Sequence, residues 1–261
     1  MTFNDEQKKL KNDSTLVETE SLSKQNDCYN SSLQEYFESS SGSSLEKLRN
    51  FAKYVPRQTL TNFLAKYEIF QKILNVHGSI IECGVFQGNG LMTWANLSSI
   101  FEPYNHQRKI IGFDTFSGIP DVSEQDKTSI SEHCHPNALR SDSHEDLLKC
   151  ISIYDKNRTL DHIQKVSLVK GDITQTVPDY LRNNPHTIIS LLYLDCVVYE
   201  PTKTALKYFL PKMPKGSIIA FDELNSDLWP GETIAVIEEL GLSKREIHRF
   251  PFASFLSYTI I

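Results

Sequence analysis

Three acidic residues with the chemistry of a cation site follow two apolar runs of this 261-residue chain. Asp195 comes directly after Leu191–Leu194, and Asp222 and Glu223 come directly after Ile218–Phe221. An acid that ends a buried strand costs desolvation energy unless it is paired or binds a cation. Neither segment contains Lys or Arg, and carboxylate oxygens are the ligands that a hard divalent metal such as Mg²⁺ prefers. The alternative is that these carboxylates point into solvent or cap the helices that follow.

A glycine-rich turn, ECGVFQGNG over residues 82–90, separates an apolar run from a helical pattern. Glycines such as Gly84 and Gly88 let the backbone pass close to a ligand. The start of the following helix offers free N–H groups to a carboxylate or a phosphate. The turn is not GxGxxG and lacks the Lys of a phosphate loop, so a tight turn with close packing remains an alternative.

Two more acids end predicted strands. Asp114 ends the strand after the glycine turn, where an acid can accept both hydroxyls of a ribose. A solvated loop carboxylate is the alternative, and the preceding glycine turn favours the ribose interpretation. Asp172 ends the third strand and could face an adenine amino group. It could equally cap the next helix, because Asp is a good N-cap residue.

The elements that position these residues alternate between strands and helices, which predicts parallel βαβ units and a doubly wound, Rossmann-like α/β fold. We expect a seven-stranded, mostly parallel sheet with an antiparallel C-terminal hairpin. The predicted strands are Ser79–Val85, Lys109–Phe116, Val166–Gly171, Thr187–Val198, Gly216–Glu223, Ile247–Phe252 and Phe255–Ile261. The predicted helices between them cover residues 88–100, 145–155, 158–164, 176–182, 201–210 and 231–240.

Two regions lie outside this alternation. Residues 1–44 are polar and end in a Ser-rich stretch, which predicts a flexible tail or a loosely attached helix. Residues 45–261 then form the main domain, which begins with two helices separated by Pro56. Residues 119–145 are polar and long for a loop, and such insertions are often lids or binding loops.

Composition limits the partners and the compartment. The net charge of −6 argues against nucleic acid as a partner, because phosphate binding needs a surplus of Lys and Arg. No apolar run is long enough to span a bilayer, and the polar N-terminus lacks a signal-peptide core. Five widely spaced cysteines without a CxxC fit reduced thiols. We therefore expect a cytoplasmic protein that acts without membrane or nucleic acid.

The motifs in combination resemble the macrocin O-methyltransferase family over about residues 45–250. The resemblance implies a class I methyltransferase fold, S-adenosylmethionine (SAM) as cofactor, Mg²⁺ or a similar divalent cation, and a sugar hydroxyl as acceptor. It also makes a homo-oligomer plausible. The segments that carry it are IECGVFQG (81–88), GFDTFSGIP (112–120), GDI (171–173), LDCVVYEPT (194–202) and FDEL (221–224).

The resemblance also implies roles for individual residues. The metal would bind two neighbouring hydroxyls of the acceptor, and Asp195 would be both a metal ligand and a catalytic residue, with Asp222 and Glu223 completing the metal site. The residues expected to bind SAM are Glu82, Gly84, Val85, Phe86 and Gly88 at its methionine end, Asp114 and Thr115 at its ribose, and Asp172 at its adenine.

One position departs from the family pattern. The family reads Asp-x-Asp-x-Tyr after the fourth strand, and its second Asp is the proposed general base. Here the run is DCVVY over residues 195–199, and Val197 cannot take a proton. The metal alone could acidify the hydroxyl, transfer could be slow or lost, or another group could act as the base. The candidate bases are Glu200, His133, His135 and His144.

These residues predict a SAM-dependent O-methyltransferase that acts on a small glycosylated metabolite or a nucleotide sugar. Trp229, at the start of the last predicted helix, either walls the acceptor site or serves only in hydrophobic packing and at the helix start. One rival is a methyltransferase for a non-sugar acceptor, and another is a SAM-binding protein without turnover. An NAD-dependent oxidoreductase would share the glycine turn and Asp114, but it leaves the acids at 195, 222 and 223 unexplained.

Overall fold

The computed structural model describes residues 27–127 and 135–261, which fall into two compact units, Met1–Thr59 and Leu60–Ile261. In the first unit, residues 27–39 are helical, so their part of the predicted N-terminal segment takes the helical alternative. Helix α2 (Ser44–Arg49) follows, with Ser43 and Glu46 forming a capping box. A short 3₁₀ turn, η1 (Phe51–Lys53), leads to Tyr54.

The second unit contains a seven-stranded sheet with the strand order β3-β2-β1-β4-β5-β7-β6. Strands β1 to β5 are parallel, whereas β7 runs antiparallel to both β5 and β6. The predicted doubly wound sheet with a reversed C-terminal hairpin is therefore confirmed. The strands are β1 (Ser79–Cys83), β2 (Ile110–Asp114), β3 (Val166–Lys170), β4 (Ile189–Leu194), β5 (Ile218–Phe221), β6 (His248–Phe250) and β7 (Ala253–Ile260).

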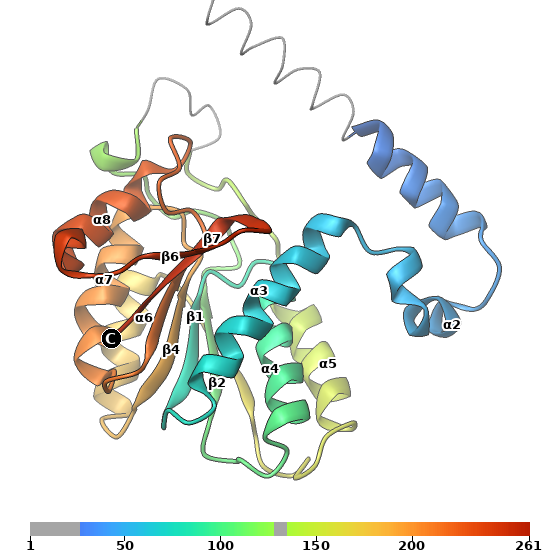
Figure 1. Cartoon of the computed structure of the whole chain (residues 1–261), viewed down its shortest axis with the longest axis horizontal. Coiled ribbons are helices and arrows are strands. Elements are labelled where there is room, and N and C mark those ends of the chain that lie inside the picture. Colours follow the sequence, from blue (N-terminus) through green and yellow to red (C-terminus); the bar gives the residue numbers. More distant parts are fainter. Residues whose placement is uncertain (1–26, 128–134) are drawn as a thin grey trace, which may run out of the picture. The chain divides into compact units, whose positions relative to one another are not determined.

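Helices cover both faces of this sheet (Figure 1). One face carries α3, α4 and α5, and the opposite face carries α6, α7 and α8. Parallel strands need such crossover connections, and the resulting layers bury both faces. The helices are α3 (Arg57–Ile73), α4 (Asn89–Phe101), α5 (His144–Asp155), α6 (Ile173–Asn183), α7 (Tyr199–Phe209) and α8 (Pro230–Leu240).

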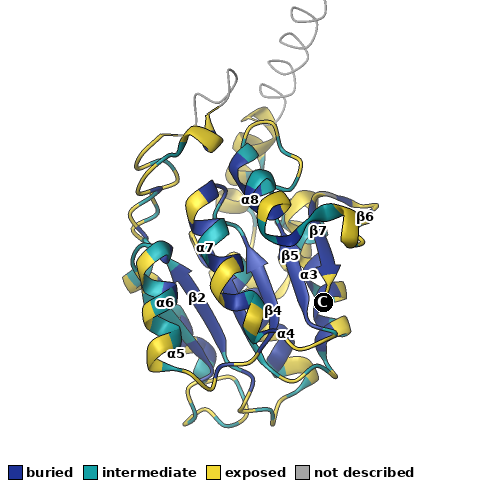
Figure 2. Ribbon diagram, turned by 90° about the vertical axis from the view of Figure 1, so that its left-hand side faces the viewer, coloured by how far each residue is buried: buried dark blue, intermediate teal, exposed yellow. Residues whose placement is uncertain are grey.

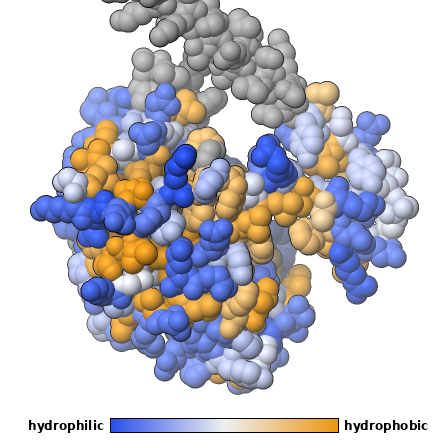
Figure 3. Space-filling view, in the orientation of Figure 1, coloured by the Kyte–Doolittle hydropathy of each residue, from blue (hydrophilic) through white to orange (hydrophobic). Residues whose placement is uncertain are grey.

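Successive strand residues enter two different cores, as a period of two requires. Ile80 packs with α3 and α4 on one face, and its neighbour Ile81 packs with α6 and α7 on the other. Tyr193 and Leu194 divide between the two faces in the same way. Figure 2 shows the central strands β4 and β5 buried throughout and the helices exposed along their outer sides. Hydrophilic and hydrophobic residues are accordingly interspersed over the face drawn in Figure 3.

Two predicted elements differ from the structure. Residues 158–164 form turns and not a helix, because Leu160 takes a left-handed conformation (φ 59°). The Arg158 guanidinium donates to the carbonyl oxygens of Leu160 (2.8 Å) and Ile163 (2.5 Å), which folds the segment back on itself. Strand β4 ends at Leu194, and the apolar residues beyond it form a loop that enters the site described next.

Candidate active site

The carboxyl ends of β1 and β4 meet where the strand order reverses, which is where open α/β sheets bind ligands. Gly84, at φ 90°, turns the chain away from β1. A Cβ on Gly84 would lie 2.0 Å from the carbonyl oxygen of Asp195, so only glycine lets these two strand ends approach. The neighbouring strand is tied in by the Asp195 N–H, which donates to the Cys83 carbonyl at 2.8 Å.

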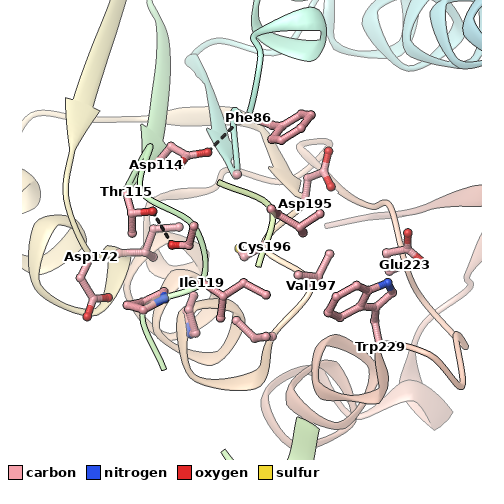
Figure 4. A pocket seen from close by; sticks show the side chains of 17 residues that line it. Phe86, Asp114, Thr115, Ile119, Asp172, Asp195, Cys196, Val197, Glu223 and Trp229 are labelled. Atoms are coloured by element: carbon pink, nitrogen blue, oxygen red, sulfur yellow. Dashed lines mark hydrogen bonds between the residues drawn. The ribbon is translucent and has the colours of Figure 1, made fainter. Parts of the chain in front are cut away.

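A cavity of about 280 Å³ opens at these strand ends. Gly84, Phe86, Asp114, Thr115 and Asp172 are among the residues that line it. Asp195, Cys196, Val197, Glu223 and Trp229 also line it, as Figure 4 shows, together with residues 118–120 and 139 of the insertion, Ile173, Val198 and Pro201. Most of the residues that line this cavity had therefore been singled out from the sequence.

Asp114 organises the glycine turn through backbone hydrogen bonds. Its Oδ2 accepts the N–H groups of Val85 (2.7 Å) and Phe86 (2.8 Å), and its Oδ1 accepts that of Phe116 (2.6 Å). The bond to Phe86 is drawn in Figure 4. Phe86 has a φ of 51°, a strained value for a bulky residue, and this carboxylate helps to hold it there.

Thr115 and Asp172 also have structural partners at the cavity edge. The Thr115 hydroxyl donates to the carbonyl oxygen of Gly118 at 2.6 Å and so shapes the turn after β2. Asp172 is the N-cap of α6, and its Oδ1 accepts the N–H of Thr174 at 2.8 Å. The cap that the sequence offered as an alternative for Asp172 is therefore present, while the side chain still lines the cavity.

Glu82, Val85 and Gly88 lie close to the cavity but are not among the residues that line it. Glu82 is buried beneath the turn, where Trp94 Nε1 donates to its carboxylate at 2.7 Å. Burial raises the pKa of Glu82 to about 8. Gly88 begins α4 at φ 86°, and a Cβ there would collide with the Leu147 side chain. These three residues therefore support the glycine-rich turn after β1 and do not line the cavity themselves.

The predicted metal acids lie at two adjacent strand ends. Asp195 and Glu223 line the cavity, whereas an oxygen of Asp222 accepts the Tyr193 hydroxyl at 2.6 Å. Burial, followed by the nearby Asp222 carboxylate, raises the pKa of Glu223 to about 7. The same two causes hold the pKa of Asp195 well above its usual range. Among residues 27–127 and 135–261, no three His, Cys, Asp or Glu side chains are arranged to hold a metal ion.

Two charged residues that sequence reasoning missed face this acidic group. Lys66 of α3 is buried, and its ammonium donates to the Tyr193 hydroxyl at 2.8 Å. Glu232 of α8 is fully buried, and its Oε1 accepts the N–H of Glu223 at 3.2 Å. Burial holds the pKa of Glu232 well above its usual range. Lys66 shares a helical face with Ile69, Phe70 and Ile73, and that spacing was the signal for its burial.

Val197 lies in the cavity wall where the family places a base. It is 7 % exposed and has a φ of 58°. With Ile119 and Val198 it forms a small apolar cluster, against which Val122, Ala138 and Trp229 pack. Trp229 therefore packs on this cluster and also lines the cavity, and its role toward an acceptor stays a prediction.

The other candidate bases lie elsewhere. His144 packs on the Phe116 ring at 5.1 Å between centroids, and its Nδ1 lies 3.2 Å from a Glu145 carboxylate oxygen. Glu200 is exposed and borders a second cavity with Asp121 and Asp172. His135 is exposed, and its Nδ1 lies 3.0 Å from the carbonyl oxygen of Pro136. His133 lies outside the described residues.

The insertion is fastened to the domain at both ends. Asp126 is buried, and its Oδ1 accepts the N–H of Tyr199, the first residue of α7, at 2.7 Å. Its Oδ2 accepts the N–H (2.9 Å) and the hydroxyl (2.6 Å) of Ser123. At the far end, the hydroxyls of Ser141 and Ser143 donate to the carbonyl oxygen of Phe86.

The fold is that of a class I SAM-dependent methyltransferase. The model of the family described as Macrocin-O-methyltransferase (TylF) matches residues 8–237. The chain belongs to the macrocin O-methyltransferase family and is an O-methyltransferase. No curated protein matches the chain. Within the described residues, no helix is long and apolar enough to cross a membrane.

Three solved structures are similar to this chain. CalS11, a calicheamicin methyltransferase, is 35% identical with a TM-score of 0.83, covering 88% of this chain and 90% of its own. The apo structure of CalS11, described as a TDP-rhamnose 3'-O-methyltransferase, is 34% identical with a TM-score of 0.76, covering 88% and 92%. The O-methyltransferase NovP shares the fold at 20% identity, with a TM-score of 0.61 and coverage of 76% and 78%.

Proposed function

We propose that this enzyme transfers a methyl group from SAM to a hydroxyl of a sugar, carried on a nucleotide or on a small glycosylated metabolite. The observation that carries the proposal is one cavity with Asp114 and Asp172 at one end and the carboxylates of Asp195 and Glu223 at the other. Carboxylates are good acceptors for sugar hydroxyls. The similarity to a TDP-rhamnose 3'-O-methyltransferase at 34% identity supports a nucleotide sugar.

The cofactor would occupy the Asp114 end of the cavity. Asp114 would accept the ribose hydroxyls, with Thr115 close by, and Asp172 would lie near the adenine. Gly84 and Phe86 would line the methionine end, held in place from below by Glu82, Val85 and Gly88. This arrangement would direct the methyl group toward Asp195, where the acceptor hydroxyl must lie in line with the breaking C–S bond.

Asp195, Asp222 and Glu223 would hold a divalent cation such as Mg²⁺. All three offer the oxygen ligands that a hard cation prefers, but no three such side chains of the described residues are arranged around one point, so these would have to turn toward one another to hold it. Burial is the largest cause of the raised pKa values of Asp195 and Glu223, and the Asp222 carboxylate is the second, so a bound cation would favour the ionised form of both acids. When bound, the cation would lower the pKa of the acceptor hydroxyl and orient it.

The chemical step needs an acceptor for one proton. The methyl carbon leaves the sulfonium, the C–S bond breaks and a C–O bond forms, and the hydroxyl proton must go to a nearby base. Val197 cannot take it, so the cavity carboxylates of Asp195 and Glu223 would bear that role together with the electrostatics of the site. A missing general base typically costs ~10²–10⁴-fold in rate, so we expect a slow enzyme unless these groups compensate.

Val197 is also the observation that favours a second candidate. A SAM-binding protein with little or no turnover would keep the Asp114 end of the cavity and lose the base. A methyltransferase for a non-sugar acceptor would keep both ends of the cavity and bind a different hydroxyl. Methyl transfer to TDP-rhamnose, measured beside a catechol and a simple amine, separates these functions. A homo-oligomer and a cytoplasmic location remain predictions.

The first experiment is calorimetric titration of S-adenosylhomocysteine on wild type and Asp114→Ala, with and without Mg²⁺. We expect micromolar binding by wild type and a loss on the order of 10–100-fold in the variant, since hydrogen bonds to a charged group contribute about 1.5–3 kcal/mol. Asp179→Ala, an exposed acid of α6, should bind like wild type. Absence of binding by wild type would refute the SAM site.

A further inference from the structure

A lysine of α3 is buried against the strand that precedes Asp195. Lys66 is 3 % exposed, and a lysine is almost never buried to this degree unless it is paired. Its ammonium donates to the Tyr193 hydroxyl at 2.8 Å and to Asn62 Oδ1 at 2.5 Å. It also lies over the Tyr193 ring, 4.3 Å from the ring centroid. Lys66 therefore interacts with Tyr193 through both a hydrogen bond and its charge.

The hydrogen bonds from Lys66 to Asp222 run in one direction. An ammonium can only donate, whereas a tyrosine hydroxyl has one proton to donate and two lone pairs that accept. Because Lys66 donates to the Tyr193 oxygen, the hydroxyl proton is directed to Asp222 Oδ1, which accepts it at 2.6 Å. None of the hydrogen bonds within residues 27–127 and 135–261 uses Asp222 Oδ2. One oxygen of this carboxylate is thus held by the protein, and the other is left for a ligand.

Stability alone does not explain a charge at this position of α3. Removing an ammonium group from water is costly, and apolar side chains of similar volume often replace buried ion pairs without loss of stability. The other buried residues of this helical face include Ile69, Phe70 and Ile73. An apolar residue at position 66 would continue the same packed surface, so the ammonium points to a role in placing its hydrogen-bond partners.

Glu82 is a second buried acid near Lys66, and its hydrogen bonds lead elsewhere. Its carboxylate accepts from Trp94 Nε1 at 2.7 Å, whereas the hydrogen bonds of Lys66 go to Asn62 and Tyr193. The Trp94 ring packs edge-on against Tyr193, with 5.6 Å between the ring centroids, and so holds the tyrosine from another side. The directional contact of Lys66 is therefore with Tyr193 and, through it, with Asp222.

We propose that Lys66 and Tyr193 are positioning residues for methyl transfer, which fix the Asp222 carboxylate at the strand end next to the one that carries Asp195. The inference rests on the proposed function, in which the acids at these two strand ends act on the acceptor hydroxyl. Neither Lys66 nor Tyr193 is among the residues that line the cavity, so both act through Asp222. Residues that orient a ligand-binding carboxylate typically contribute roughly 10–100-fold to affinity or activity.

The kinetic test compares Lys66→Met, Tyr193→Phe and the variant that combines them, with SAM and TDP-rhamnose as substrates of the full chain. We expect each single variant to lower kcat roughly 10–100-fold, with little change in the KM for SAM. The combined variant should lose little more, because the hydroxyl through which Lys66 acts is already absent. Losses that multiply in the combined variant, or losses confined to the KM for SAM, overturn the inference.

The matched control is Lys72→Met, which removes an exposed ammonium of α3 that lies over the Tyr258 ring, and it should have wild-type kinetics. Crystal structures of wild type and both single variants give a second measurement that needs no acceptor. The Asp222 carboxylate should shift or take more than one position in both variants, and an unchanged carboxylate overturns the inference. If wild type does not methylate TDP-rhamnose, the proposed acceptor is refuted, and the crystal structures still decide the roles of Lys66 and Tyr193.

Discussion

At the scale of single residues, several groups of the site already serve the fold. Asp114 accepts three backbone N–H groups that fix the turns after β1 and β2. A carboxylate offers about four lone-pair sites, so capacity remains for ribose hydroxyls. The same side chain can therefore order the cofactor loop and bind the cofactor. Loss of Asp114 should weaken cofactor binding through both effects.

Glu82 gives a prediction about stability and pH. Burial raises its pKa in the folded protein to about 8 from an ordinary value of 4.5, so folding favours the protonated form. Its contribution to stability is therefore present at low pH and is lost as pH rises from about 4.5 to about 8. We expect Glu82→Gln to increase the free energy of unfolding at pH 9 by an amount on the order of a few kcal/mol, which raises the melting temperature. At pH 5 we expect little change in either quantity.

The control for this prediction is Glu68→Gln, which alters an exposed acid on α3. Thermal unfolding of the three proteins at both pH values provides the measurement. If Glu82→Gln shifts the melting temperature equally at pH 5 and pH 9, then burial of the charge does not explain the raised pKa. If it destabilises at both, the hydrogen bond from Trp94 outweighs the desolvation of the carboxylate.

At the scale of elements, the insertion depends on one buried acid. The Asp126 carboxylate caps α7 by accepting the N–H of Tyr199, the first residue of that helix. Removing it leaves the buried Tyr199 N–H without a partner, which costs about 1–3 kcal/mol. We expect Asp126→Ala to lower the melting temperature and to weaken S-adenosylhomocysteine binding, because residues 118–120 and 139 line the same cavity.

Asp121→Ala is the matched control, since this exposed acid of the same insertion accepts only a local bond from the Val122 N–H among the hydrogen bonds of the described residues. Scanning calorimetry and titration of both variants measure the two effects. Unchanged stability in Asp126→Ala would mean that water replaces the cap. Unchanged cofactor affinity alone would mean that the insertion keeps its place at the cavity without this bond.

The strands and the parallel sheet with its reversed hairpin followed from the sequence, because apolar runs separated by helical patterns leave few topologies. The sequence predicted the ends of the helices and strands less accurately. The apolar run through Val198 predicted a longer β4, yet the chain turns at Asp195, where Gly84 of the neighbouring strand end packs against its backbone. Likewise, no local pattern shows that the Arg158 side chain folds residues 158–163 into turns.

The cavity residues were foreseeable where a motif follows a strand, as with Asp114, Asp172 and Asp195. The missing residues come from elsewhere in the chain. Lys66 reaches Tyr193 from α3, and Asp126 reaches α7 from the insertion. Such pairs form only once the tertiary fold exists, so a single sequence carries little signal for them.

At the scale of the whole second unit, the sheet collects negative charge at one edge. Asp195, Asp222, Glu223 and Glu232 come from two strand ends and from α8, and each of the pKa values raised among them has burial as its largest cause. Lys66 is a buried cation on the same side, connected to Asp222 through the Tyr193 hydroxyl. A fold that buries acids in this way loses stability when they ionise, first through desolvation and then through mutual repulsion, unless a cation pairs with them.

This concentration predicts that Mg²⁺ stabilises the protein. A ligand that binds only the folded state raises the melting temperature, by roughly 3–6 °C at ten times its Kd for a domain of this size. The shift should be larger at pH 8 than at pH 5.5, because Mg²⁺ must displace protons from Asp195 and from Glu223, whose pKa is about 7. Asp222→Asn should lose most of the shift, whereas Asp227→Asn, an exposed acid on the same loop, should keep it. If Mg²⁺ does not change the melting temperature of wild type at either pH, the metal site is refuted. The acids would then act on the acceptor directly.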